Sequence, residues 1–227
     1  MTDVQTTAVD PFEADFRQWT ADLAPAQAAI GAIPPPGDGA AARADQLTTL
    51  FAYRNYRSGV DWNTCGQAAI ATIADYHGRD PYQLPRGANG HWDDGQAIDA
   101  VIAGGFGPDV VFGLGSSGGR IRDALQSYGL TASVGYSGFA SAGWQDQWAT
   151  LKAYVSQRLP VPVLVDVGAL GGSWWTAHWP VVYRIADGRV HMAAAAGSAV
   201  VDEATFLRAW HCWFLPYGFN HCAVYSY

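Results

Sequence analysis

The sequence predicts an α+β fold, with helices first along the chain and antiparallel strands later. Two features indicate this order. Up to about residue 158, apolar residues recur mostly at helical spacing, between signals that start and stop helices. From residue 160 onward, short apolar runs alternate with turn residues, and Asp187-Gly188 between two such runs is a strong hairpin signal.

The N-terminal quarter of the chain is expected to be helical. Apolar residues at Phe12, Phe16, Trp19 and Leu23 predict one or two helices within residues 11–30. A run of prolines and glycine at 34–37 interrupts this pattern, and a second helix is expected at about 40–53. We therefore expect residues 1–54 to form a helical segment packed on the core, and residues 55–227 to form one compact domain.

Caps, breakers and apolar runs predict the remaining elements. Gly78 suits the left-handed residue that ends a helix over 63–76. Asp93 and Gln96 form a capping box that opens a helix to about residue 103. Further helices are expected at 118–128, 148–158 and 202–210, and strands at 108–112, 131–136, 163–167, 179–185, 190–193 and 219–225.

Composition argues against several classes of partner. The net charge is −7 and there is no basic cluster, so neither nucleic acid nor an anionic membrane is expected as a partner. No apolar stretch approaches the roughly 20 residues that span a bilayer, and residues 1–5 show no signal peptide. We therefore expect a cytoplasmic protein. A bridge between Cys212 and Cys222 stays open, although a reducing cytoplasm fits better.

No metal and no cofactor are expected. The sequence has no Cys-x-x-Cys and no His-Glu-x-x-His spacing. Residues 113–118 match G-x-G-x-x-G, but the next expected strand ends without the acid that binds a ribose, so we reject a dinucleotide site. A helix start rich in Gly and Ser can contact a phosphate, such as that of a phosphopantetheine arm. Loop geometry explains these glycines more simply.

Cys65 is the strongest candidate for a reacting group. It follows Asn63, a residue type that caps helices, so Cys65 is expected in the first helical turn. Unpaired backbone N–H groups and the positive end of the helix dipole favour a thiolate there. A buried core cysteine is the alternative, but the flanking residues favour a nucleophile. They are Asn63, Thr64, Gly66 and Gln67.

A distant histidine supplies the matching base. His178 stands at the start of an apolar strand, and a cysteine that opens a helix together with such a histidine is typical of a thiol enzyme. His178 could instead be a satisfied core histidine beside tryptophans. His91 is a weaker alternative base.

Aromatic side chains flank these candidates. The sequence has ten tryptophans, most of which a large aromatic core explains. Several near the candidate residues would make a dry, flat-walled pocket, and we expect them to bind substrate. These residues are Trp62, Trp92, Trp174, Trp175 and Trp179. Gln67 is also expected to contact substrate, the alternative being a solvated helix residue.

Three short motifs in order resemble those of the papain-like superfamily. They are Asn-Thr-Cys-Gly at 63–66, Pro-Val-Leu-Val at 162–165 and Ala-His-Trp-Pro-Val-Val at 177–182. The resemblance covers roughly residues 55–210 and is to the compact bacterial branch that includes bacteriocin-leader peptidases. It implies a papain-like fold, with Cys65 and His178 as catalytic residues in a domain at 55–227.

Two departures distinguish the chain from peptidases of that branch. Such a peptidase carries Asp or Asn soon after the hairpin, where this chain has His191 and a run of alanines. The glutamine expected about six residues before the cysteine falls near Gly59. The histidine would then lack an orienting partner, and the oxyanion would lack a donor.

The chain is more similar to the off-loading Dieckmann cyclases that form tetramic acids in polyketide and nonribosomal peptide biosynthesis, often of antibiotics. That family uses a Cys-His-Asp triad whose aspartate lies between the other two in sequence. Asp93 or Asp94 occupies this place here. The resemblance implies that a carrier protein bearing a phosphopantetheine thioester delivers a β-keto aminoacyl chain, which Cys65 accepts and His178 helps to cyclise to a small-molecule product.

Two other functions remain open. One is a cysteine peptidase or amidase of the same fold. The other is a non-catalytic binding domain, against which the intact Cys65 and His178 argue.

Overall fold

The computed structural model describes residues 46–54, 63–110, 115–137, 143–172, 176–194, 197–212 and 219–227. All of them belong to the unit formed by residues 34–227. The helices predicted within residues 11–30 lie outside the described residues. The boundary expected at residue 54 therefore stays a prediction.

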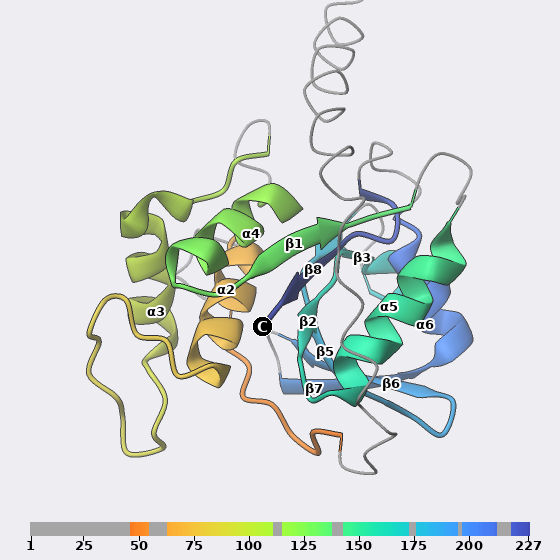
Figure 1. The fold of residues 1–227 in the computed structure, drawn as a ribbon, viewed down its shortest axis with the longest axis horizontal. Helices are drawn as coiled ribbons and strands as arrows, with labels where there is room; N and C mark the ends of the chain where they lie inside the picture. Colours follow the sequence, from red (N-terminus) through yellow and green to blue (C-terminus); the bar gives the residue numbers. More distant parts are fainter. Residues whose placement is uncertain are drawn as a thin grey trace, which may run out of the picture. The chain divides into compact units, whose positions relative to one another are not determined.

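Helices α2 (Cys65–Tyr76), α3 (Asp94–Val101) and α4 (Gly118–Ser127) lie together on one side of the strands (Figure 1). α3 continues into a π-helical turn at Ile102–Phe106. α2 is the buried centre of this group, because every residue from Cys65 to Ala74 is buried and the helix packs against both α3 and α4. The first residue of α2 therefore starts in the interior of the protein.

The described strands pair in three antiparallel sheets. β1 (Ala132–Gly135) pairs with β8 (Ala223–Ser226), and β3 (Val165–Asp166) pairs with β4 (Ala177–His178). The four-stranded sheet has the order β2 (Val161–Pro162), β5 (Val181–Ala186), β6 (Arg189–Ala194) and β7 (Gly197–Asp202). The α+β prediction is confirmed.

Two more helices, α5 (Trp144–Ser156) and α6 (Glu203–Trp210), lie on the other side of the strands (Figure 1). They meet through the rings of Trp148, Phe206 and Trp210, whose centroids are 5.6 to 6.4 Å apart. A short 3-10 turn at Gly168–Leu170 follows β3.

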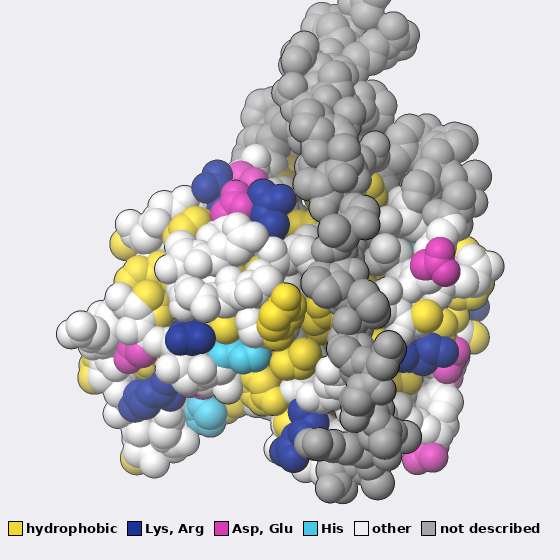
Figure 2. Space-filling model, viewed as in Figure 1, with side chains coloured by type: hydrophobic (Ala, Val, Ile, Leu, Met, Phe, Trp, Pro, Cys, Tyr) yellow, Lys and Arg dark blue, Asp and Glu magenta, His cyan; other side chains and the backbone are white. Residues whose placement is uncertain are grey.

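In the described part of the face seen in Figure 2, apolar side chains gather at the middle. None of the described helices has the length and apolar character needed to cross a bilayer.

Pro180 divides the single strand that was predicted over residues 179–185. Proline has no backbone N–H for a sheet ladder. Accordingly β5 begins only at Val181, and the preceding pair Ala177–His178 forms β4 beside β3. The break matters because it places His178 in a different sheet from the long β5–β6 hairpin. That hairpin turns at Asp187 and Gly188, both with positive φ, as predicted.

Other boundaries differ from the predictions. Residues 46–53 are not helical, so the helix expected at 40–53 is wrong over that part. Residues 108–110 form no strand. α5 begins four residues before the predicted start at residue 148, directly after the left-handed Gly143. β7 was missed, since its residues carry few strand signals, and the closing strand is shorter than expected.

Candidate active site

Cys65 is the first residue of α2, as expected. The helix is capped by Thr64 rather than Asn63, and the Thr64 side chain makes no capping hydrogen bond. The Thr64 carbonyl accepts the N–H of Ala68 at 3.0 Å, which closes the first turn. Cys65 is only 7% exposed.

Burial dominates the chemistry of this thiol. It raises the pKa of Cys65, while the backbone N–H groups of Trp179, Gly66 and Cys65 itself act in the opposite direction. The helix start therefore lowers the pKa less than the surroundings raise it. The resting group is the protonated thiol, and the thiolate expected from the sequence needs a base.

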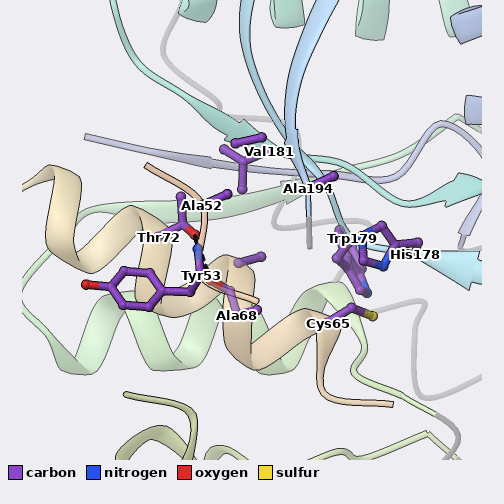
Figure 3. Close-up of a pocket in the computed structure, with 11 residues that line it drawn as sticks. Ala52, Tyr53, Cys65, Ala68, Thr72, His178, Trp179, Val181 and Ala194 are labelled. Carbon is purple, nitrogen blue, oxygen red and sulfur yellow. Dashed lines mark hydrogen bonds between the residues drawn. The ribbon is translucent and has the colours of Figure 1, made fainter. Parts of the chain in front are cut away.

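His178 is the candidate for that base, and it lines the same hollow as Cys65. It ends β4, opposite Val165 of β3, and burial lowers the pKa of His178 to about 4. The imidazole is therefore neutral at physiological pH and has a free nitrogen, although the same burial makes it a weaker base than a solvated histidine. Cys65 and His178 lie at the same end of one hollow, which encloses about 210 Å³ including space open to solvent (Figure 3).

The hollow runs along one face of α2. Cys65, Ala68, Ala69 and Thr72 follow the i, i+3, i+4, i+7 spacing of a single helix face. The opposite walls come from three other segments of the chain. These wall residues are Ala52, Tyr53, His178, Trp179, Val181, Ala193 and Ala194.

The polar groups of the walls are already bonded. The hydroxyl of Thr72 donates to the Ala68 carbonyl at 2.9 Å and accepts the N–H of Tyr53 at 3.2 Å. The Tyr53 hydroxyl donates to Asp75, away from the hollow. A thiol and a neutral imidazole are thus set among methyl groups and a tryptophan ring.

Neither predicted carboxylate contacts the histidine. Asp93 caps α3, where its Oδ1 accepts the N–H of Gln96 at 3.1 Å, and Asp94 Oδ1 accepts the N–H of Arg54 at 3.0 Å. Over the described residues, the ring of His178 has no hydrogen bond to either. Each carboxylate already accepts a backbone N–H, so a place for either in a triad stays a prediction.

A nearer carboxylate escaped the sequence analysis. Asp166 is 2% exposed and lies on β3, opposite Ala177 of β4. Adjacent residues of a strand point to opposite faces. His178 pairs with Val165 and shares its face, so Asp166 points to the other face. There it accepts the N–H of Gly168 at 2.8 Å, and it cannot orient the imidazole.

Two residues expected to bind substrate lie elsewhere. Gln67 is fully buried, and its Nε2 donates to Ser116 Oγ and to the Phe106 carbonyl, so it is neither solvated nor at the hollow. Trp92 is buried under the guanidinium of Arg86 and lines a separate cavity. The sequence alone could not show that Gln67 and Trp92 lie away from the hollow, because their burial depends on packing by α3 and α4.

The other tryptophans divide into two groups. Trp179 lines the hollow beside His178, as expected. Trp62, Trp174 and Trp175 lie outside the described residues, and their role stays a prediction.

His91 is not placed to serve Cys65. Its ring stacks on Phe51 with centroids 3.7 Å apart, and its Nδ1 donates to Asp75. Asp75 follows Cys65 by ten residues on α2, which is about 15 Å along the helix axis.

The glycine-rich start of α4 is already bonded to a carboxylate from this chain, that of Asp109. The backbone N–H and hydroxyl of Ser117 both donate to Asp109, at 2.7 and 2.6 Å. Arg120 lies 3.6 Å from the same carboxylate. Asp109 thus occupies the position where a phosphate would bind.

The remaining candidates give no site. Cys212 and Cys222 are buried free thiols, so the bridge left open by the sequence is not formed. No group of three or more potential metal ligands occurs within the described ranges.

The chain matches no family model and no curated protein. Among solved structures it is similar to the peptidase domain of Streptococcus ComA, a bifunctional ABC transporter of a quorum-sensing pathway. The identity is 15%, the match covers 78% of this chain and 96% of that one, and the TM-score is 0.49. It is also similar to a double-glycine-motif protease from an AMS/PCAT transporter, in complex with the leader peptide. That identity is 12%, with 80% and 95% coverage and a TM-score of 0.46. These likenesses concern the fold alone.

Proposed function

We propose that the protein is a thiol enzyme that takes an acyl group onto Cys65, with His178 as the base. The observation that carries this proposal is that both side chains line one hollow, although they come from α2 and from β4 more than a hundred residues later. A buried thiol and a neutral imidazole with an accessible edge are the two groups that acyl transfer requires.

The proposed first half-reaction transfers the acyl group. His178 removes the proton of the Cys65 thiol as sulfur attacks a thioester carbonyl. The tetrahedral intermediate then collapses to an acyl-enzyme, and the leaving thiol takes the proton from the imidazolium. The backbone N–H of Cys65, at the helix start, is a suitable donor to the oxyanion.

The finer proposal is a Dieckmann cyclisation on a carrier-bound β-keto aminoacyl thioester. In the acyl-enzyme, neutral His178 removes a proton from the carbon between the keto and amide carbonyls. That carbanion attacks the acyl carbonyl and closes a five-membered ring. Cys65 leaves as thiolate and regains the proton from the imidazolium, so the tetramic acid and free enzyme are released without water.

The lining of the hollow supports cyclisation over hydrolysis. Ala193 and Ala194 form its β6 wall, and Trp179 and Val181 cover its strand side. Apolar walls exclude water, which would otherwise hydrolyse the acyl-enzyme. One observation favours hydrolysis: His178 is only partly covered, so water can reach the base. A peptidase or amidase is therefore the second candidate.

A single incubation separates the two candidates. The protein is mixed with an N-acylated β-keto aminoacyl thioester on a pantetheine-type thiol or on a carrier protein. The products are identified from their masses by mass spectrometry. A cyclase gives the tetramic acid, whereas a hydrolase gives an acid that is heavier by one water. Cleavage of peptides with no reaction of β-keto thioesters would remove the cyclase proposal.

Variants then assign the two groups. Cys65→Ala and His178→Ala should abolish turnover and leave the fold intact. Cys212→Ala and His191→Asn are the matched controls, since both lie away from the hollow. A fully active Cys65→Ala variant would end the covalent mechanism.

A further inference from the structure

A chain of buried polar contacts links α2 to the segment that carries the base. Gln67 Nε2 donates to Ser116 Oγ at 2.8 Å and to the Phe106 carbonyl at 2.7 Å. The carbonyl of Ser116 in turn accepts the indole N–H of Trp179 at 2.8 Å. Gln67, Ser116 and Trp179 are all buried, so these contacts are shielded from water.

Ser116 also touches the helix directly beside the nucleophile. A Cβ placed on Gly66 would lie 2.5 Å from Ser116 Cβ and 2.6 Å from its Oγ. Gly66 is therefore the point at which the Ser116 loop rests on α2. Since φ at Gly66 is not positive, this close approach is what requires glycine there.

Ser116 also contacts the segment that carries His178. Trp179 follows His178 in sequence, and its backbone N–H lies close enough to the Cys65 sulfur to favour the thiolate. Its indole is fixed by the Ser116 carbonyl. Ser116 thus contacts Gly66 on one side and Trp179 on the other, each next to one member of the reacting pair.

We propose that Ser116 is a positioning residue, a bridge that sets the separation between Cys65 and His178. The proposal rests on the proposed function only in that these two side chains act together. The bridge acts through its neighbours and touches no reacting atom.

The expected effect of disturbing the bridge follows from the contact at Gly66. In Gly66→Ala the Ser116 loop must retreat from 2.5 Å to an ordinary contact of at least 3.4 Å, a shift of about 0.9 Å. A misplacement of about 1 Å can lower turnover on the order of 10²-fold. Removing the Ser116 side chain takes away the atoms that clash, while the carbonyl that binds Trp179 remains.

The test compares Gly66→Ala, the double variant Gly66→Ala/Ser116→Gly, and the control Gly119→Ala. Gly119 is the second residue of α4, as Gly66 is of α2, but the nearest atom to its added Cβ is 3.6 Å away. Two readouts are taken: turnover of the thioester, and the pH profile for alkylation of Cys65 by iodoacetamide. Thermal unfolding checks that each variant folds.

The bridge predicts that Gly66→Ala loses on the order of 10²-fold in turnover. Its alkylation profile should also move to higher pH, because the backbone N–H of Trp179 moves away from the Cys65 sulfur. The double variant should recover about tenfold of that loss and move the profile back. Gly119→Ala should match the wild type. If the folded double variant is no faster than Gly66→Ala, and its profile is not restored, the bridge is overturned.

Two further outcomes are also decisive. If the wild type turns over no thioester, the proposed function fails, but the alkylation profiles still decide on the bridge because they need no substrate. If Gly66→Ala does not fold, Trp179→Phe takes its place, since it keeps an aromatic ring and removes the donor to Ser116 together with one ring of the indole. An unchanged profile in folded Trp179→Phe overturns the bridge.

Discussion

Asp75 fastens the segment 51–54 to α2, and replacing it by asparagine tests what holds that wall of the hollow. Its side chain is 6% exposed and accepts three hydrogen bonds. The Tyr53 hydroxyl donates at 3.1 Å, and Arg86 Nη1 and His91 Nδ1 each donate at 2.5 Å. Asparagine keeps the shape but removes the charge and one acceptor.

The magnitude follows from exposure. A buried hydrogen bond to a carboxylate stabilises by about 1.5–3 kcal/mol, which applies to the contact with Tyr53. The side chains of Arg86 and His91 are 37% and 33% exposed, so solvent screens both contacts. Each then contributes no more than about 1 kcal/mol. Loss of all three contacts would cost about 1.5–5 kcal/mol. Because asparagine keeps the shape and one acceptor, Asp75→Asn should lower the free energy of unfolding by about 2–3 kcal/mol.

Urea denaturation at neutral pH measures this change, and the midpoint of thermal unfolding should fall by about 5–10 °C. Asp123→Asn is the matched control, because Asp123 is 52% exposed and pairs only with Arg122 among the described contacts. Its loss should stay within about 1 kcal/mol. Equal losses in the two variants would refute the view that Asp75 holds the wall at Tyr53.

Three other outcomes are expected. Since burial lowers the pKa of His178 to about 4 and raises that of Cys65, alkylation of Cys65 should show no histidine step between pH 5 and 8 and should still rise above about pH 8.5; a plateau at neutral pH would contradict this. Ala69→Leu should fill the hollow and block turnover, while lowering the free energy of unfolding by about 1–3 kcal/mol. Ala71→Leu, equally buried on α2 but lining the other cavity, should lower the free energy of unfolding by a similar amount and leave turnover unchanged. Asp93→Asn keeps a good helix cap, so stability and turnover should change little; a fall in turnover on the order of 10⁴ would instead place this carboxylate on His178 during the reaction.

Local signals in the sequence predicted local structure well. Asp93 and Asp202 cap helices through contacts to residues three positions on, and Asp187-Gly188 forms the predicted turn. Each of these features depends on neighbouring residues alone. The sequence also placed Cys65 in the first turn of its helix, although the cap is Thr64 and not the expected Asn63.

Features that depend on distant parts of the chain were harder to predict. The burial of Gln67 depends on Phe106 and Ser116, about 40 and 50 residues away, and nothing near Gln67 indicates it. The protonated state of Cys65 reflects how deeply α2 is covered, which outweighs the helix start. The division of the strand at Pro180 could have been anticipated, because proline cannot continue a ladder.

The covered, protonated sulfur at the start of α2 also bears on how long the protein survives in the presence of peroxide. Oxidants attack the thiolate rather than the thiol, and the later products, sulfinic and sulfonic acids, are not readily repaired. A nucleophile kept neutral by its surroundings should therefore be spared between encounters with substrate. Under the proposed mechanism, the same surroundings that protect the sulfur against oxidation also set how readily it reacts.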